Sequence, residues 1–433
     1  MKAFAICVLI ICVSSPGYAQ NWRSFGSGMN GEIDALLEDK QAGRLYAGGM
    51  FNSAAGTAAN NIAQWDGNSW AALGSGTNSV VNDLALFQDE LYAVGSFSSP
   101  GNHIAKWNGT SWSGVGGGTN SSSFALQLLG DDLYVGGAFT AAGSVDANYV
   151  AKWDGNNWSA LGGGTDGVVR ALGVYKNELY VGGDFTMADG KTVNHIARWD
   201  GAAWQPLGTG LDAAVWAIQE FMGDLYVGGL FNSAGGNTAV RVAKWDGNNW
   251  SAVGSSLNNS VFALAEYNGE LYAGGFFQMI WATSAPASRI AKWDGNAWSA
   301  IGDGLNDGVF ALSSTTQALY IGGNFTASGS TTLNNITALG HPVPIDPAFG
   351  GRGIMSVSPN PMNTQARIQL DGLPAFSSYK LELIDVHGTC VQQTLHTSAE
   401  GLYLQRNHLP SGLYAYRLMG EGHLIGQGKI VMQ

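Results

Sequence analysis

The chain has few cysteines, few charged residues and no helix-rich stretch. Of its 433 residues, 12% are charged and three are cysteines: Cys7, Cys12 and Cys390. So few cysteines exclude a fold that depends on several disulfides. The formal net charge is −12, and no cluster of Lys and Arg stands out. Because nucleic acids and anionic lipids reward basic patches, we expect neither as a partner.

A long hydrophobic run is missing as well. The apolar stretch "AFAICVLIICV" at residues 3–13 is too short to cross a membrane as a mature helix. Lys2 precedes it and small residues follow as far as Ala19, which is the pattern of a secretory signal peptide over residues 1–19. Its removal would leave Cys390 without an internal partner, and no transmembrane segment is expected in the exported protein.

Glycine and tryptophan are abundant instead, with 63 and 15 copies. The phrase "AKWDGNNWSALGGG" at residue 151 recurs in variants that begin at residues 63, 105, 197, 243 and 291. The tyrosine of "LYVGG" and its variants marks seven repeats: Tyr46, Tyr92, Tyr134, Tyr180, Tyr226, Tyr272 and Tyr320. A phrase that recurs every ~46 residues is the signature of a repeated structural unit.

Each repeat contains four short strand-like runs, with an Asp-Gly turn between the last two. Seven such units predict an all-β, seven-bladed β-propeller over residues 20–340. The last unit lacks a fourth strand, and "NWRSFGSG" at residues 21–28 is a fourth strand with no blade before it. We therefore expect this segment to pair with "NNITALG" and to close the ring.

The double glycine, the Trp-Asp-Gly hairpin and the period over residues 21–340 resemble kelch-type propeller repeats. They are also similar to the repeats of fungal cortical cell-polarity markers. The resemblance implies a propeller fold and leaves the function open, because propellers of this kind include both enzymes and binding proteins.

The sequence changes character after residue 340, and we expect a linker over residues 341–354. Residues 355–433 contain "SPNP" at 358, "LIDVHG" at 383 and "LPSGLY" at 409. They resemble the C-terminal sorting domain of the type IX secretion system of Bacteroidetes. This implies a small immunoglobulin-like β-sandwich that engages the type IX machinery, and a protein that is secreted or attached to the outer cell surface. The alternative is an ordinary accessory β-sandwich.

Two tryptophans have no counterpart in other repeats, Trp216 and Trp281, whereas the other thirteen stand at repeat positions and are expected to pack between blades. The first strand of each unit follows the pattern Val-x-Ala-Leu, and its x position varies: Asp34, Asn82, Phe124, Arg170, Trp216, Phe262 and Phe310. These seven side chains either form a ring near the central channel, where a polar ligand with an apolar face could bind, or fill the space between blades.

The candidate ligand-binding residues are those that break the repeat: Asp34, Asn82, Arg170, Trp216, Phe262 and Trp281. One hypothesis has a sugar stacked on Trp216, with Arg170 or Asp34 binding its hydroxyls. The leading interpretation is a binding module for a glycan or a protein. The alternative is an extracellular polysaccharide hydrolase or lyase that uses Asp34 and Arg170.

No catalytic residue is assigned, because no Ser-His-Asp order, HExxH motif or recognisable carboxylate pair appears. The propeller repeats hold no cysteine and only two histidines, His103 and His195. We expect both to start a third strand rather than to bind metal. No metal site and no cofactor are expected.

Overall fold

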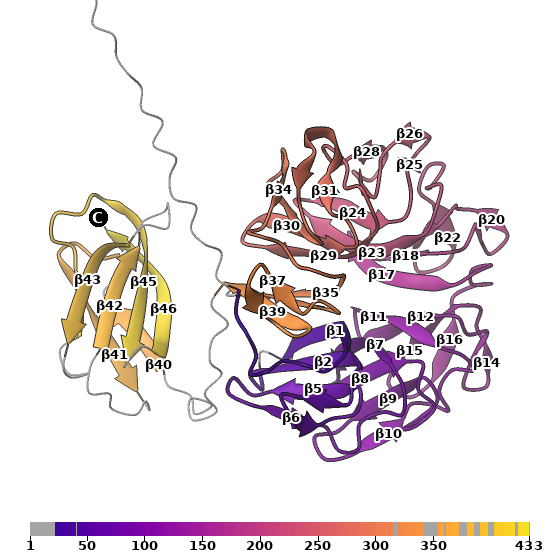
Figure 1. Ribbon diagram of the computed structural model, residues 1–433, viewed down its shortest axis with the longest axis horizontal. Helices are drawn as coiled ribbons and strands as arrows, with labels where there is room; N and C mark the ends of the chain where they lie inside the picture. Colours follow the sequence, from indigo (N-terminus) through magenta and orange to yellow (C-terminus); the bar gives the residue numbers. More distant parts are fainter. Residues whose placement is uncertain are drawn as a thin grey trace, which may run out of the picture.

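The computed structural model describes residues 22–39, 41–315, 318–340, 354–358, 361–371, 379–384, 390–396, 402–420 and 423–432. The predicted signal peptide (1–19) lies outside these residues, as does the predicted linker except for its last residue. The predicted fold class is confirmed: the described chain forms a seven-bladed β-propeller and a smaller two-sheet unit (Figure 1).

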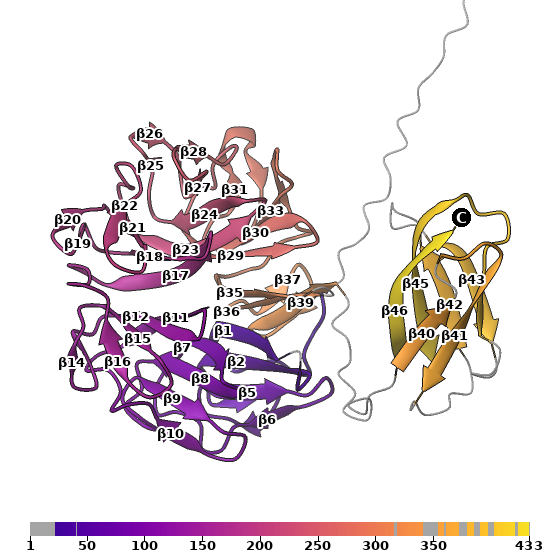
Figure 2. The same ribbon diagram turned by 180° about the vertical axis from the view of Figure 1, so that it is seen from behind.

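The seven inner strands surround the centre of the ring (Figures 1 and 2). Each contacts the inner strands of both neighbouring blades, and the last contacts the first, so the ring is closed. They are β1 (Glu32–Asp39), β7 (Val81–Phe87), β11 (Ser123–Leu129), β17 (Val169–Tyr175), β23 (Val215–Phe221), β29 (Val261–Tyr267) and β35 (Val309–Ser314).

Each blade continues outward as an antiparallel sheet. The second strands are β2 (Arg44–Met50), β8 (Glu90–Gly95), β12 (Asp132–Gly137), β18 (Glu178–Gly183), β24 (Asp224–Gly229), β30 (Glu270–Gly275) and β36 (Ala318–Gly323). The third strands are β5 (Ile62–Trp65), β9 (Ile104–Trp107), β15 (Val150–Trp153), β21 (Ile196–Trp199), β27 (Val242–Trp245), β33 (Ile290–Trp293) and β39 (Ile336–Gly340). Six blades have a fourth: β6 (Trp70–Ala72), β10 (Trp112–Gly114), β16 (Trp158–Ala160), β22 (Trp204–Pro206), β28 (Trp250–Ala252) and β34 (Trp298–Ala300).

The double glycine of the second strand lets neighbouring chain segments approach closely. A Cβ atom on Gly182 would lie 2.6 Å from Cγ1 of Val215 in the next blade, and one on Gly183 would lie 2.0 Å from the Val168 carbonyl oxygen. Any side chain at either position would force the backbone apart. The first glycine therefore allows close packing against the next blade, and the second allows close approach of the first strand within the blade. The second blade has Val94 at the first of these positions.

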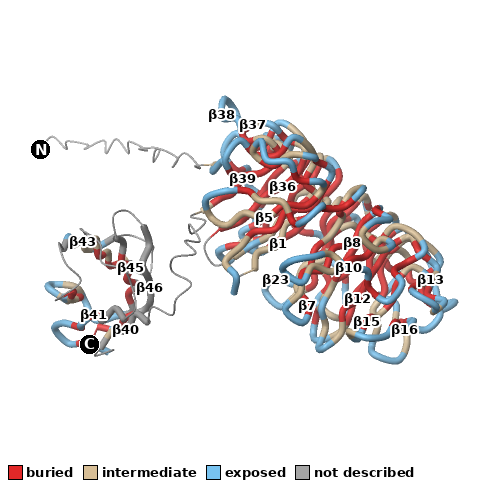
Figure 3. Tube along the Cα trace, turned by 90° about the horizontal axis from the view of Figure 1, so that it is seen from below, coloured by how far each residue is buried: buried red, intermediate tan, exposed pale blue. Residues whose placement is uncertain are grey.

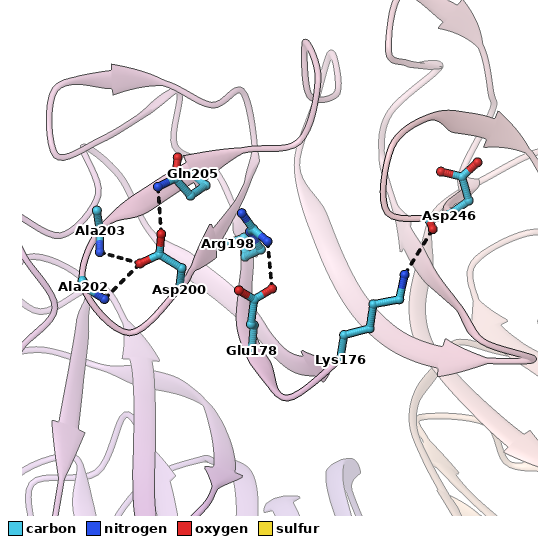
Figure 4. Close-up of polar contacts among 8 residues, drawn as sticks. All are labelled: Lys176, Glu178, Arg198, Asp200, Ala202, Ala203, Gln205 and Asp246. Carbon is cyan, nitrogen blue, oxygen red and sulfur yellow. Dashed lines mark hydrogen bonds and ion pairs between the residues drawn. The ribbon is translucent and has the colours of Figure 1, made fainter.

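The Asp-Gly phrase forms the loop between the third and fourth strands, as Figure 4 shows for Asp200. Its carboxylate accepts hydrogen bonds from the N–H groups of Ala202 (3.0 Å) and Ala203 (2.8 Å) and from the side-chain amide of Gln205 (2.8 Å). These bonds, that of Ala203 above all, lower the pKa of Asp200 to about 2. Gly201 has a φ of 95°, a conformation that glycine adopts without strain.

The tryptophan after each loop joins neighbouring blades. Trp204 is completely buried, and its indole N–H donates to the Leu161 carbonyl of the preceding blade at 2.8 Å. The same bond recurs from Trp70, Trp112, Trp158, Trp250 and Trp298 to the preceding blade. These residues are structural, as expected from their recurrence.

The segment before the first blade completes the last one, as predicted. Arg23 forms an antiparallel bridge with Ala338, and its carbonyl accepts a hydrogen bond from the Thr337 hydroxyl at 2.9 Å. Phe25 is 3% exposed, and its carbonyl accepts the indole N–H of Trp70 in the first blade. The pairing is one bridge rather than a full strand, but it connects the last blade to the first.

Six blades carry a small hairpin between the second and third strands. The hairpins are β3 (Ser53–Ala54) with β4 (Thr57–Ala58), β13 (Ala141–Ala142) with β14 (Val145–Asp146), β19 (Met187–Ala188) with β20 (Lys191–Thr192), β25 (Ser233–Ala234) with β26 (Asn237–Thr238), β31 (Met279–Ile280) with β32 (Ala285–Pro286), and β37 (Ala327–Ser328) with β38 (Thr331–Thr332). In five of them the hairpin is bridged to the segment that precedes the inner strand, so both loops lie on one face. The 3-10 helix η1 (Trp281–Thr283) interrupts the hairpin of the sixth blade.

The C-terminal unit consists of two sheets around one apolar core. One contains β40 (Ile354–Ser358), β41 (Gln365–Asp371) and β44 (Tyr403–Gln405); the other contains β42 (Tyr379–Ile384), β43 (Cys390–His396), β45 (Gly412–Gly420) and β46 (His423–Met432). In the propeller, buried residues follow the strands and exposed residues gather at the loops (Figure 3). Within the described ranges, no helix is long and apolar enough to span a membrane.

Candidate ligand site in the central channel

Each inner strand contains a β-bulge near its start. In β17, Val169 pairs with Gly183 and Ala171 pairs with Gly182, so Arg170 has no partner in the ladder. The register shifts at the same place in all seven blades. Bulges re-aim side chains and are common beside binding sites. The bulged residues are the variable positions of the sequence pattern: Asp34, Asn82, Phe124, Arg170, Trp216, Phe262 and Phe310.

All seven bulged side chains line one cavity of about 770 Å³. This volume lies within the range of small-ligand pockets. Five of the six sequence candidates are therefore brought together, whereas Trp281 is not among the lining residues. Trp281 lies on η1 in the hairpin of the sixth blade, and its side chain is 56% exposed.

One side of the cavity is aromatic. Trp216 and Phe262 are stacked, with ring centroids 4.5 Å apart and an angle of 22° between the rings. Phe310 contacts Phe262 at 5.6 Å, and Phe276 contacts both phenylalanines edge-on. These rings come from three consecutive blades and form a continuous apolar wall.

Arg170 extends this wall. Its guanidinium lies 5.4 Å from the ring centroid of Trp216 and 5.6 Å from that of Phe124. Its Nε donates to the Asp184 carboxylate at 2.5 Å. Trp216 thus contacts both Arg170 of the preceding blade and Phe262 of the next. The hypothesis of a sugar stacked on Trp216 stays a prediction.

The other side of the cavity is acidic. Burial raises the pKa of Asp34 to about 8, and the charge and hydrogen bond of Glu32 add to the effect. Burial also raises the pKa of Asp83 to about 7, although its carboxylate accepts hydrogen bonds from the N–H groups of Leu126 (2.7 Å) and Leu84 (2.8 Å). Near neutral pH, both groups therefore hold a substantial fraction of their protons. Asn82 donates to the Ser123 carbonyl at 2.9 Å.

Sequence reasoning missed Asp83 and a second group of lining residues. Asp83 stands where the other six inner strands have a buried alanine: Ala35, Ala125, Ala171, Ala217, Ala263 and Ala311. A comparison of that neighbouring position between repeats would have found it. The residue after each double glycine also varies, and two residues at this position, Phe276 and Asn324, line the cavity.

The two raised pKa values predict how stability depends on pH. An unfolded Asp titrates near pH 4, so between about pH 4 and pH 8 the folded protein binds more protons than the unfolded chain. We expect the free energy of unfolding to fall, on the order of a few kcal/mol, as pH rises from 5 to 8. The carboxylates with lowered pKa values, such as Asp200, titrate below this window. Burial lowers the pKa of His103, which opposes the trend inside the window, but the two carboxyl groups outweigh one histidine.

Urea denaturation at pH 5 and pH 8 measures the effect. Asp34→Asn and Asp83→Ala should each reduce the difference between the two pH values. The control Glu220→Gln changes a carboxylate that is exposed and outside the cavity, and it should leave the difference unchanged. Equal or greater stability of the parent protein at pH 8 would contradict the prediction.

Comparison with known proteins identifies both parts of the chain. Residues 356–433 match the secretion system C-terminal sorting domain. Residues 122–263 match the Rax2 C-terminal β-propeller domain. The predicted propeller and sorting domain are thereby confirmed, and the sorting domain indicates type IX export to the cell surface or the medium. The likeness to kelch repeats stays a prediction.

Several solved structures are similar to the chain at low identity. One is the extracellular domain of a hybrid two-component system from B. thetaiotaomicron, with 10% identity, a TM-score of 0.47, and coverage of 95% of this chain and 57% of that one. Another is PorZ, a surface component of the type IX secretion system of Porphyromonas gingivalis, with 12% identity, a TM-score of 0.44, and coverage of 93% and 59%. The chain thus spans less than two thirds of either protein. No curated protein matches it.

The described residues do not include a group of three or more His, Cys, Asp or Glu side chains that could hold a metal ion. The cavity presents carboxyl groups and an amide on one side, and aromatic rings with one arginine on the other.

Proposed function

We propose that the protein is an exported binding module that holds a glycan in the central channel of its propeller. The observation that carries the proposal is the set of seven bulged side chains, one from each blade, that line one cavity and differ from blade to blade. A repeated scaffold needs only one residue type at a structural position, as the alanine after the bulge shows in six of the seven blades. The varied lining is suited to a single ligand that has no sevenfold symmetry.

A sugar combines hydroxyl groups with apolar C–H faces, and the cavity offers a partner for each. Asp34 and Asn82 present polar groups, and Phe310 presents an aromatic ring in the adjacent blade. Because Phe310 lies on β35, which contacts the strand that carries Asp34, it is our candidate to contact a sugar ring whose hydroxyls reach Asp34. The cavity is a concave pocket rather than a broad surface, which favours a glycan over a folded protein partner.

The rival interpretation is a polysaccharide hydrolase or lyase with Asp34 and Arg170 as its catalytic groups. Arg170 is held by Asp184, and Asp34 is hydrogen-bonded to Glu32. Two carboxyl groups in direct contact are closer than the ~5–9 Å that separates the pair of glycosidases. The arrangement therefore supports binding better than glycoside hydrolysis.

A glycan array with the full-length protein tests the proposal. The best glycan should bind at least about tenfold more weakly to Phe310→Ala, because the variant removes the apolar contact. Trp281→Ala is the matched control, since it removes an aromatic residue away from the cavity, and its affinity should be unchanged. Incubation with the same glycan should release no shorter product.

Three outcomes would contradict this account. Loss of binding in Trp281→Ala but not in Phe310→Ala would place the site on the sixth blade. Shortened products that disappear in Asp34→Asn would establish the hydrolase or lyase. Binding to extracellular proteins but to no glycan, with the same dependence on Phe310, would change the ligand class to protein.

A further inference from the structure

The charges of the cavity wall are unbalanced. Among the described residues that line it, three are acidic, Glu32, Asp34 and Asp83, and one is basic, Arg170. Arg170 is already paired with Asp184, so it does not compensate the three carboxyl groups. An anionic ligand would be disfavoured here, whereas a cationic ligand would favour the ionised form of these carboxyl groups.

The acidic groups of the first blade lie beside the last blade. Strand β1, which carries Glu32 and Asp34, contacts both β35 and β36 of that blade. Phe310 of β35 and Asn324, directly after β36, line the same cavity. The side-chain oxygen Oδ1 of Asn324 is buried and has no hydrogen-bond partner within the described part of the chain. This corner therefore combines carboxyl oxygens, an unsatisfied amide oxygen and an aromatic ring.

An ammonium group matches the polar and aromatic groups of this corner. An ammonium group has three N–H donors and no acceptor, and it is attracted to carboxylates, to amide oxygens and to the face of an aromatic ring. A hydroxyl group satisfies the acceptors but brings no charge. We propose that the channel takes a sugar with a free amino group, whose ammonium is held by Glu32 and Asp34 beside Phe310 and the polar wall residue Asn324.

This inference rests on the proposed glycan function and makes it more specific. It also implies a proton exchange, because a cation beside Asp34 lowers the pKa that burial and Glu32 have raised. Asp34 then gives its proton to the solvent as the ligand binds. The other charged groups that line the cavity, Asp83 and Arg170, keep their hydrogen-bonded partners.

The test compares two oligosaccharides of equal length, glucosamine oligomers with free amines and N-acetylglucosamine oligomers without them. Calorimetry with the full-length protein in 0.15 M salt, at a pH where the sugar amines are fully protonated, should show the amine ligand bound at least tenfold more tightly, about 1.4 kcal/mol. At this salt concentration, exposed charges are screened beyond about 8 Å. Titrations in two buffers of different ionisation enthalpy should show proton release for the amine ligand alone.

Glu32→Gln and Asp34→Asn should each reduce the affinity for the amine ligand at least tenfold, and by a clearly larger factor than they reduce the affinity for the acetylated ligand. Glu220→Gln, which removes an exposed carboxylate of β23 outside the cavity, should change neither. Proton release is measured on the parent protein, so a variant that fails to fold does not decide the result.

Equal or tighter binding of the acetylated oligomer, or amine binding without proton release, would overturn the inference while the glycan proposal stands. Equal loss of affinity in Glu220→Gln would also overturn it. The attraction would then come from the overall negative charge of the protein and not from the carboxyl groups of the cavity. If trilysine binds as tightly as the amino sugar and depends equally on Glu32, the ligand is a peptide amine and the amino-sugar assignment is wrong. Failure of every sugar on the array defeats the glycan proposal itself.

Discussion

A chain that begins at Asn30 is expected to unfold at a much lower temperature than one that begins at Trp22, or to aggregate. The shorter chain loses the bridge between Arg23 and Ala338 and the buried ring of Phe25. That ring contacts Trp65 at 5.5 Å and Tyr320 at 5.9 Å, in the first and last blades. Loss of a buried Phe alone costs about 3–5 kcal/mol, a large part of the ~5–15 kcal/mol that stabilises a typical domain.

Thermal unfolding of both chains, followed by tryptophan fluorescence, measures the difference. The chain that begins at Trp22 is the matched control, because it lacks only the residues before the closing segment. Phe25→Ala in the full chain should reproduce a large part of the loss. Equal melting temperatures of the two chains would refute closure of the ring by this segment.

Removal of residues 412–433 should abolish export in a host that has a type IX secretion system. These residues form β45 and β46, which provide Tyr416, Leu418 and Ile430 to the core of the C-terminal sandwich. Without them the sorting domain cannot fold, whereas the propeller has its own closed core. We expect the truncated protein to accumulate in the periplasm with a folded propeller and to disappear from the surface and the medium.

Immunoblots of the periplasmic, surface and medium fractions measure this effect, and tryptophan fluorescence of the retained protein checks its fold. As a control, residues 354–433 fused to an unrelated periplasmic protein should carry it across the outer membrane. Normal export of the truncated chain would show that the C-terminal unit is only an accessory domain.

The architecture could be predicted because each structural requirement is repeated in the sequence. Only glycine fits at Gly182 and Gly183, and only a tryptophan reaches the carbonyl of the preceding blade as Trp204 does. Six copies of each constraint reveal the period, and the incomplete last repeat reveals the closing segment. That this segment forms one bridge rather than a strand depends on its local geometry, which the repeat does not encode.

The candidate site could be predicted only in part. The variable position of the pattern located the bulged residues, because a position without a structural requirement is free to vary. Asp83 was missed because it takes the place of an alanine in one repeat alone. The stack of Phe124, Arg170 and Trp216 depends on contacts between blades, and no pattern within one repeat reports them.

The most direct test of the proposed site is a crystal structure of the full-length protein with the glycan that binds best on the array. We predict that the glycan lies in the central channel, with its polar groups at Asp34 and Asn82 and a sugar ring against Phe310. A glycan on the hairpin of the sixth blade at Trp281, with the central channel empty, would contradict the account.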